Sequence, residues 1–396
     1  MNKSSKVILL FLLVTYFFGY IGFKGLPLLN TFHLSILLWG TFLGFSKERK
    51  FRSTLLMIII SLVFCAVSSY YYRGQTYFQS LQASFVILDL FFYYFLVHYN
   101  LSVRKMERII VVLIIGACAC YVFQQITFPS VYFIGASYEW VHKSLTPHRF
   151  IQIHGQSLIS LGLFFGLNRL LETRKTEYIL LIILCFSCLL IRGFRIMLLA
   201  SIISSCWLIF RYKKRVFSAK YAMYFVLIIG LVFVSLLIPV VNDAITNMIS
   251  RQSSGQTLDN DDYARTIQFV YYTTEHFHSF VEYFFGSGLP GNSAYGEYIS
   301  TELPQRAINW VDWGLLGLSW LGGIPLVFFI IRYMVKCIKT KLPRKYHYIN
   351  AWFCFLLIIS LTHPEVYQHN SMVVQAFVLY LFYKIRNEKN RLSFRQ

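Results

Sequence analysis

Arginine is the residue type whose placement in this chain most suggests chemistry. Arg192 and Arg195 lie in the stretch RGFR, between two apolar runs. A charged side chain near the centre of a bilayer costs about 2.5–3.5 kcal/mol, so such a pair needs a reason to be there. Arg251 and Arg265 follow in a long polar segment. Because the planar guanidinium fork binds phosphate bidentately, we expect these four arginines to bind phosphate or pyrophosphate.

Two structural explanations compete with that chemistry. Long arginine side chains at helix ends reach lipid headgroups at little cost, which would account for Arg192. Arg265 would contact lipid phosphates if its segment formed an amphipathic helix on the membrane surface. The position of the arginines relative to the membrane therefore decides between binding and a structural role.

A single helix is predicted for residues 258–286, because acidic residues occupy its first turn and Gly286 ends it. Arg265 and His276 are eleven residues apart, which places them on one face of that helix. Proton abstraction by an enzyme needs a histidine or a carboxylate within reach of the reacting group. His276 and Asp312 are accordingly the candidate catalytic residues.

The composition identifies the elements that must position these residues. Hydrophobic residues make up 57% of the 396 residues, charged residues 14%, and the mean hydropathy is +0.55. A soluble globular protein carries about 25% charged residues, so this class is excluded. Apolar runs of membrane-crossing length recur along the chain and predict an all-helical membrane protein with about 12 transmembrane helices. The expected spans are residues 7–23, 27–45, 53–70, 81–99, 107–125, 151–168, 178–191, 194–210, 221–241, 310–331, 347–362 and 370–383.

Lysine and arginine predict the orientation of these spans. With the N-terminus in the cytoplasm, most of the 37 basic residues fall in cytoplasmic segments such as SKERKFRS and RYKKRVFSAK. Such a bias is typical of the cytoplasmic side of membrane proteins, and an even number of spans places both termini there. The net charge of +20 is then a signal of topology and of contact with anionic lipids. We expect no nucleic acid as a partner.

Two outer segments are long enough to carry a function. Residues 1–396 are expected to form one transmembrane domain, from which residues 126–150 and 242–309 extend on the outer side. The larger segment contains aromatic and aliphatic residues throughout, so we expect it to fold on the membrane surface. Neither segment has the residue spacing of a common metal site, and the eight cysteines lie in or beside apolar runs. We therefore expect no metal ion.

Several short motifs resemble one known family. These are RGFRIMLLASIISS, the arginine segment YARTIQF, the glycine segment FFGSGLPGNS and WVDWGLLGLSWLGGIP. Their order resembles that of the Wzy-type O-antigen and capsular polysaccharide polymerases and the related O-antigen ligases. The resemblance covers residues 180–335 and the number and orientation of the spans.

The resemblance implies a glycosyltransferase on the outer side of the bacterial cytoplasmic membrane. Such enzymes join oligosaccharide repeat units linked to undecaprenyl pyrophosphate, with no metal, cofactor or nucleotide sugar. Arg192 and Arg265 match the family's arginines and would hold the pyrophosphate. The implied partners are lipid-linked oligosaccharides, the lipid bilayer, and a chain-length regulator or a flippase of the same pathway.

One departure from the family weakens the ligase interpretation. Ligases carry a histidine between the glycine segment and the re-entry motif, and this chain has none between Gly288 and Asp312. A flippase or transporter remains an alternative because Asp89 lies inside a predicted span, where carboxylates often couple to ions. A membrane acyltransferase is a third alternative, but no paired histidine and acid is evident in an outer-facing span.

Overall fold

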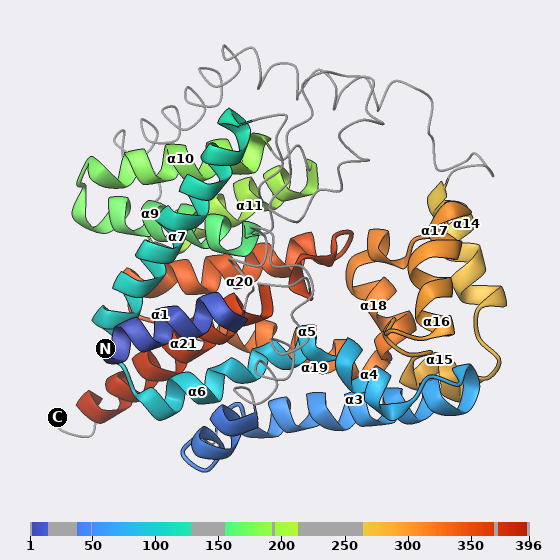
Figure 1. Ribbon diagram of the computed structural model, residues 1–396. Helices are drawn as coiled ribbons and strands as arrows, with labels where there is room; N and C mark the ends of the chain where they lie inside the picture. Colours follow the sequence, from blue (N-terminus) through green and yellow to red (C-terminus); the bar gives the residue numbers. More distant parts are fainter. Residues whose placement is uncertain are drawn as a thin grey trace.

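The computed structural model describes residues 2–14, 38–48, 50–127, 155–191, 195–212, 264–367 and 371–393. Within these residues the secondary structure is entirely helical (Figure 1). The all-helical class expected from the sequence is therefore confirmed for this part of the chain. The longer helices are α1 (Lys3–Val14), α3 (Arg52–Arg73), α6 (Phe92–Tyr99), α7 (Val103–Ile126), α9 (Gln156–Thr173), α10 (Glu177–Ile191), α11 (Arg195–Tyr212), α18 (Gly314–Gly322), α19 (Ile324–Lys339), α20 (His347–Ile359) and α21 (Ser371–Ser393).

The remaining elements are short. Several lie between Ala264 and Trp313, where the chain makes one-turn helices separated by tight bends. These short elements are α4 (Tyr77–Ala83), α5 (Phe85–Leu88), α14 (Ala264–Val270), α15 (Phe280–Phe285), α16 (Ala294–Glu297), α17 (Leu303–Gln305), the π-helical turns Tyr271–Glu275 and Tyr298–Glu302, and the 3-10 turns Asp89–Phe91, Trp310–Trp313, Arg344–Tyr346 and Pro364–Val366.

Two helices of the described chain are long and apolar enough to cross a membrane. These are α3 and α7, and the bent segment Tyr77–Tyr99 makes a third if its two parts, which meet at 51°, count as one span. The apolar helices α10 and α11 are shorter. This number is below the expected twelve, and the predicted spans 27–45 and 221–241 lie partly or wholly outside the described residues.

The predicted span 310–331 is wrong as a single helix. The chain instead forms the 3-10 turn Trp310–Trp313, then α18, then a break at Gly323, and then α19. Gly323 has a φ of 91°, and a side chain there would collide with the backbone of Phe285, whose carbonyl carbon would lie 2.6 Å from the added Cβ. Gly323 thus lets the backbone of Phe285 pack against the break, and α19 begins there with a proline in its first turn.

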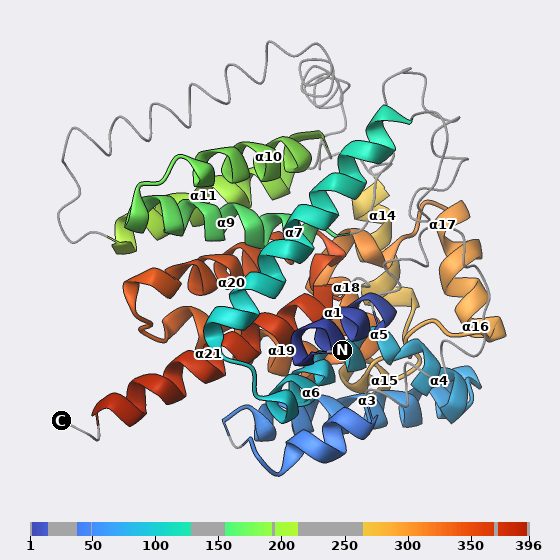
Figure 2. The same cartoon turned by 60° about the vertical axis from the view of Figure 1, so that its left-hand side comes forward.

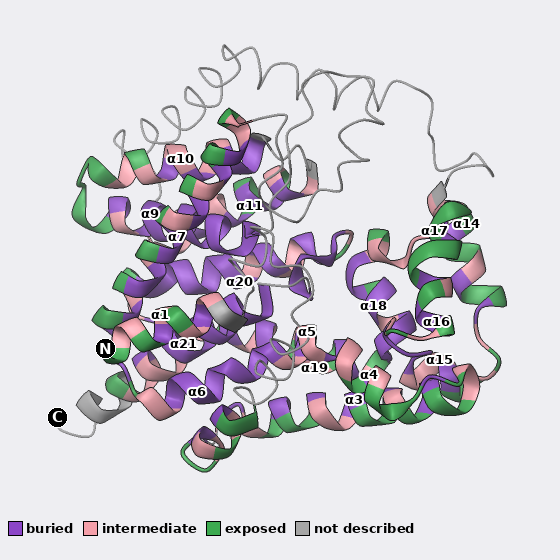
Figure 3. Ribbon diagram, viewed as in Figure 1, coloured by how far each residue is buried: buried purple, intermediate pink, exposed green. Residues whose placement is uncertain are grey.

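The core of the bundle is built around α9, α20 and α21. Most of the described side chains of these three helices are buried, whereas α3 has a green outer face in Figure 3. Gly162 lets α7 and α10 approach α9, since an added Cβ would lie 2.6 Å from Ile114 Cγ2 and 2.7 Å from Cys185 Sγ. Small residues serve this purpose between membrane helices. In Figure 2, α9, α10 and α11 form a layer above α20. Direct contacts of α20 with α9 and with α11 support this arrangement.

Polar contacts between helices gather at two ends of the bundle. At the first end, Arg169 forms an ion pair with Glu107, with distances of 2.6 and 2.7 Å from Nη2 to the two carboxylate oxygens. Other contacts join the same end and connect segments that were expected on the cytoplasmic side. They are Lys50 with Asn387, Lys336 with Lys50, Lys384 with Asn100, Arg211 with Ile338 and Thr340, and Asn168 with Arg344.

The second end joins segments that were expected on the outer side. Figure 1 shows α14, α15, α16 and α17 gathered at the end of α3, beside α4. Gln79 at this end donates to the carbonyl of Asn292 at 2.7 Å. The N–H of Leu315 donates to the carbonyl of Ser360 at 2.8 Å. Within the described part of residues 242–309, α15 packs against α3, α18 and α19.

Candidate functional site

The glycine segment Gly286–Gly288 joins the short elements at the second end of the bundle to α18. Its backbone N–H groups at Ser287 and Gly288 donate to the carbonyls of Trp320 and Leu321 at 3.1 and 2.9 Å. Gly286 and Gly288 have φ values of 92° and 111°, which favour glycine. The two glycine motifs FFGSG and LGGIP are therefore neighbours in space, and their backbones pack closely against each other.

The predicted single helix over residues 258–286 is wrong in its described part. The chain forms α14, then a π-helical turn over Tyr271–Glu275, and begins a new helix only at Phe280. Glu282 holds this break in place: its buried carboxylate accepts a hydrogen bond from the backbone N–H of His278 at 2.7 Å. The backbone N–H of Glu282 donates to the Ser279 hydroxyl at 3.2 Å, which caps the new helix. The residues preceding 264 lie outside the described chain.

Glu282 also pairs with an arginine that comes from a distant helix. Arg73, at the end of α3, donates through Nε to Glu282 Oε1 at 2.5 Å and through Nη2 to the carbonyl of His276. Its guanidinium lies 5.4 Å from the centre of the Tyr295 ring. Arg73 therefore ties α3 to the break between the two helices. The sequence carries no signal for this pairing, because Arg73 and Glu282 are 209 positions apart.

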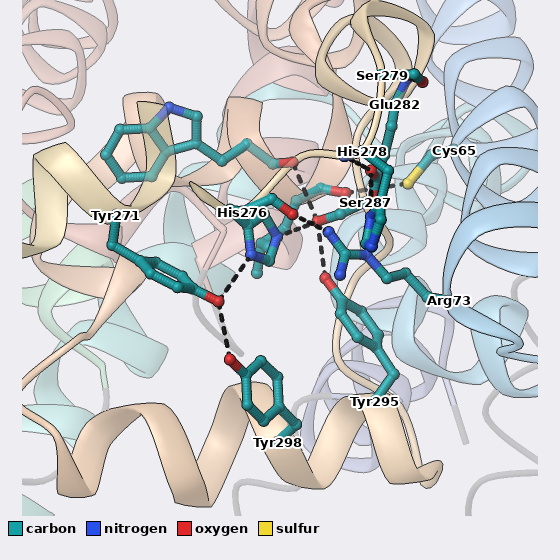
Figure 4. Close-up of polar contacts among 12 residues, drawn as sticks. Cys65, Arg73, Tyr271, His276, His278, Ser279, Glu282, Ser287, Tyr295 and Tyr298 are labelled. Atoms are coloured by element: carbon teal, nitrogen blue, oxygen red, sulfur yellow. Dashed lines mark hydrogen bonds and ion pairs between the residues drawn. The ribbon is translucent and has the colours of Figure 1, made fainter. Parts of the chain in front are cut away.

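His276 lies at the centre of this cluster and is buried. Figure 4 shows its ring between Tyr271 and Ser287, with Nδ1 3.3 Å from the Tyr271 hydroxyl and Nε2 2.9 Å from the Ser287 hydroxyl. Tyr295 donates to Ser287 at 2.7 Å, and Tyr271 shares a hydrogen bond of 3.0 Å with Tyr298. Both ring nitrogens thus have partners inside the protein.

The surroundings keep His276 neutral. Burial, and secondarily the positive charges of Arg73 and His278, lower the pKa of His276 from 6.5 to about 3. The imidazole is only 2% exposed. A general base must reach the proton that it removes. In this arrangement the imidazole holds the π-helical turn against the glycine segment.

Asp312 and Arg265 lie on a more open part of the same end. Asp312 is exposed, and its Oδ2 lies 3.4 Å from Gln268 Nε2, while no described residue donates to its Oδ1. Arg265 is half-buried and close enough for its charge to act on the Asp312 carboxyl, although no ion pair within 4.0 Å joins these two described residues. The structure thus brings together two of the residues expected at the site, one from each motif.

Gln268 holds this part of the site in place. Its Nε2 donates to the carbonyl of Ala307 at 2.8 Å, and its Oε1 accepts from the indole Nε1 of Trp313 at 3.0 Å. Gln268 is only 2% exposed, so these bonds are shielded from water. The contacts of Gln268 with Ala307 and Trp313 have no signal in the sequence.

The other expected arginines are not placed. Arg192 and Arg251 lie outside the described residues, and Arg195 begins α11 with a side chain that is not described. The proposed gathering of four arginines around one pyrophosphate therefore stays a prediction. Within the described ranges, no group of three or more histidine, cysteine, aspartate or glutamate side chains could hold a metal ion.

No protein-family model matches the chain, and no curated protein shows significant sequence similarity to it.

Proposed function

We propose that the chain is a membrane glycosyltransferase that polymerises oligosaccharide repeat units linked to undecaprenyl pyrophosphate, on the outer face of a bacterial cytoplasmic membrane. The observation that carries this proposal is that Arg265 lies close enough for its charge to act on the Asp312 carboxyl, which Gln268 of the same helix, α14, also contacts. This transfer requires a guanidinium that binds the phosphate and a carboxylate that accepts the proton of the attacking hydroxyl.

The contacts at the two ends of the bundle support the proposed topology. Segments rich in lysine and arginine meet at one end, as in the ion pair of Arg169 with Glu107. The segments with Arg265, Asp312 and Arg73 meet at the other end. The proposed topology has about twelve spans with both termini in the cytoplasm, because segments rich in lysine and arginine are typical of the cytoplasmic side.

The proposed reaction assigns one role to each charged residue. The acceptor sugar hydroxyl attacks the anomeric carbon of the donor chain, and its proton passes to the Asp312 carboxylate. The new C–O bond forms as the bond from the anomeric carbon to the pyrophosphate oxygen breaks, and that oxygen keeps the electron pair. Arg265 stabilises the charge that develops there, together with Arg192, Arg195 and Arg251.

His276 has a positioning role in this proposal. It is buried, and its ring bonds to Tyr271 and Ser287 rather than facing the Asp312 carboxylate. We assign the general base to Asp312 because its side chain is exposed and its Oδ1 accepts no hydrogen bond from a described residue.

A second candidate function is supported by Asp89. Asp89 is 3% exposed and begins a 3-10 turn between α5 and α6, within the segment that bends by 51°. Interrupted helices with a buried acid are typical of ion-coupled transporters. The alternative is therefore a flippase that moves the lipid-linked oligosaccharide across the membrane.

Deletion of the gene in its native host distinguishes these functions. Loss of a polymerase should leave single lipid-linked repeat units on the outer face, where an added impermeant glycosidase can cleave them. Loss of a flippase should leave the same units on the inner face, protected from that enzyme. Complementation with Asp312→Asn should fail and with Asp89→Asn should succeed. Accumulation on the inner face, or rescue by Asp312→Asn, would contradict the polymerase.

The proposed partners follow from the same reaction. A flippase of the pathway would supply the lipid-linked units at the outer face, and a chain-length regulator would limit their addition. Both interactions are proposals that rest on the polymerase function.

A further inference from the structure

The exposed surface near Asp312 is aromatic. Trp313 is half-buried, and its ring centre lies 5.5 Å from that of Phe269, which is 43% exposed. Behind them Trp320 is fully buried and stacks on Tyr272, with ring centres 4.6 Å apart and an angle of 8°. The outer rings therefore rest on a rigid aromatic stack.

A second indole projects from the same side of the 3-10 turn. Residues three apart in a 3-10 helix eclipse each other, so Trp310 and Trp313 share a face with a spacing of about 6 Å along the axis. Trp310 is half-buried and stacks on Tyr367 at 5.4 Å. The Tyr367 side chain is 8% exposed, and its hydroxyl has no hydrogen-bond partner among the described residues.

The orientation of the Trp313 ring is fixed before any ligand arrives. Its Nε1 donates to Gln268 Oε1, and the Gln268 Nε2 donates in turn to the carbonyl of Ala307. Ala307 has a φ of 62°, an uncommon conformation for a residue other than glycine. Such strain persists only where the surrounding structure enforces it, and it often marks a binding site. A fixed ring loses little entropy when a ligand stacks on it.

From this arrangement we infer that Trp313, Trp310 and Asp312 form a subsite for the acceptor sugar, in which pyranose rings stack on the indoles and ring hydroxyls donate to the Asp312 carboxylate. The inference rests on the proposed function, because it names the site at which the acceptor of that reaction binds. The weakly polar face of a sugar ring fits an indole, and the hydroxyl at its edge fits a carboxylate.

Two other ligands fit the surface less well. A quaternary ammonium group also binds between aromatic rings beside a carboxylate, but the Arg265 charge opposes a cation at this position. Tryptophans also anchor proteins at lipid headgroups. The Trp313 Nε1 donates inward to Gln268, so it is not available to a headgroup, and the neighbouring Asp312 repels anionic lipids.

The test measures binding of a lipid-free sugar. The probe is the repeat-unit oligosaccharide of the native host, released from its lipid by mild acid, and the full-length protein is held in nanodiscs. We expect saturation-transfer NMR to show binding that weakens about tenfold in Trp313→Ala and less than about threefold in Trp313→Phe. Trp39→Ala is the matched control, because Trp39 is 62% exposed and belongs to another helix. It should bind as tightly as the wild type.

The outcomes separate this inference from the proposed function. Equal binding by the wild type and Trp313→Ala, or displacement of the oligosaccharide by choline, overturns the subsite. If Trp313→Ala does not fold, Trp310→Ala replaces it in the comparison, and binding equal to that of the wild type overturns the subsite. A wild type that extends lipid-linked units but binds no free oligosaccharide also overturns the subsite and leaves the polymerase intact. A wild type that binds the sugar but forms no polymer supports the subsite and removes the proposed function.

Discussion

At the scale of single residues, charge and burial divide the outer end into two parts. In the cluster of Arg73, Glu282 and His276, the last two are buried and Arg73 is half-buried, and each side chain bonds to another protein group. Asp312 and Arg265 lie nearby with much more contact with solvent. A satisfied buried cluster fixes a structure, whereas an open carboxylate and guanidinium can bind a substrate.

Replacing Arg265 by lysine tests phosphate binding at this position. Lysine keeps the positive charge but loses the bidentate fork, so the donor should bind about 10- to 100-fold more weakly. We expect the KM for the lipid-linked donor to rise, while Arg306→Lys, at an exposed position, should behave as the wild type. An unchanged KM for the donor in Arg265→Lys would exclude a phosphate contact there.

Replacing His276 by glutamine tests its positioning role through pH. The folded protein keeps the pKa of His276 near 3, whereas the unfolded chain takes up a proton near 6.5. The stability contributed by neutral His276 is therefore fully present above about 6.5 and is lost as the pH falls toward about 3. Thermal unfolding in detergent should show a smaller loss of stability over this range in His276→Gln than in the wild type. Parallel pH curves, or an abolished activity in a folded His276→Gln protein, would contradict this role.

At the scale of elements, the outer end depends on two helix breaks that fit one another. The segment Gly286–Gly288 bonds to the end of α18, and Gly323 leaves no room for a side chain against Phe285. The breaks position Asp312 and the tryptophans relative to α14. Because the two breaks pack against each other, a substitution in one should also destabilise the other.

Gly288→Ala tests this fit. The added Cβ would collide with the Ser69 side chain, and the φ of 111° disfavours alanine, so we expect a loss of about 1–3 kcal/mol in the free energy of unfolding. Gly116→Ala on α7 is the control, because a Cβ added there would meet no atom of another described segment within 4 Å, and alanine favours helices. Denaturant unfolding compares the two variants. Equal stabilities would show that the interlock contributes little.

The sequence predicted those elements that depend on local pattern. Residues 53–70 and 107–125 were expected to be helices, and α3 and α7 contain them. The helix expected over 258–286 was wrong because its break depends on Arg73, which is distant in the sequence. For the same reason the roles of Glu282 and Gln268 could not be predicted: their partners come from other segments. The approach of Arg265 to Asp312 could not be predicted either, because it depends on how two segments distant in the sequence pack.

At the scale of the whole molecule, the proposal requires the two ends of the bundle to lie on opposite sides of a membrane. Asn292 is exposed at the end that carries Asp312, and Lys341 is exposed at the other end, near Arg211. In intact cells, an impermeant maleimide should label Asn292→Cys but label Lys341→Cys only after permeabilisation. The wild type, with buried or half-buried cysteines, gives the background. Labelling of both variants in intact cells would contradict the orientation.

The most direct measurement is polymerisation by the purified protein. The full-length chain is reconstituted in liposomes with lipid-linked repeat units and a chelator, and without nucleotide sugars. We expect a ladder of lengthening products from the wild type, and a rate about 10²- to 10⁴-fold lower from Asp312→Asn. The result that would contradict the proposal is a wild-type reaction that leaves only single units, or an Asp312→Asn protein that makes the same ladder at the same rate.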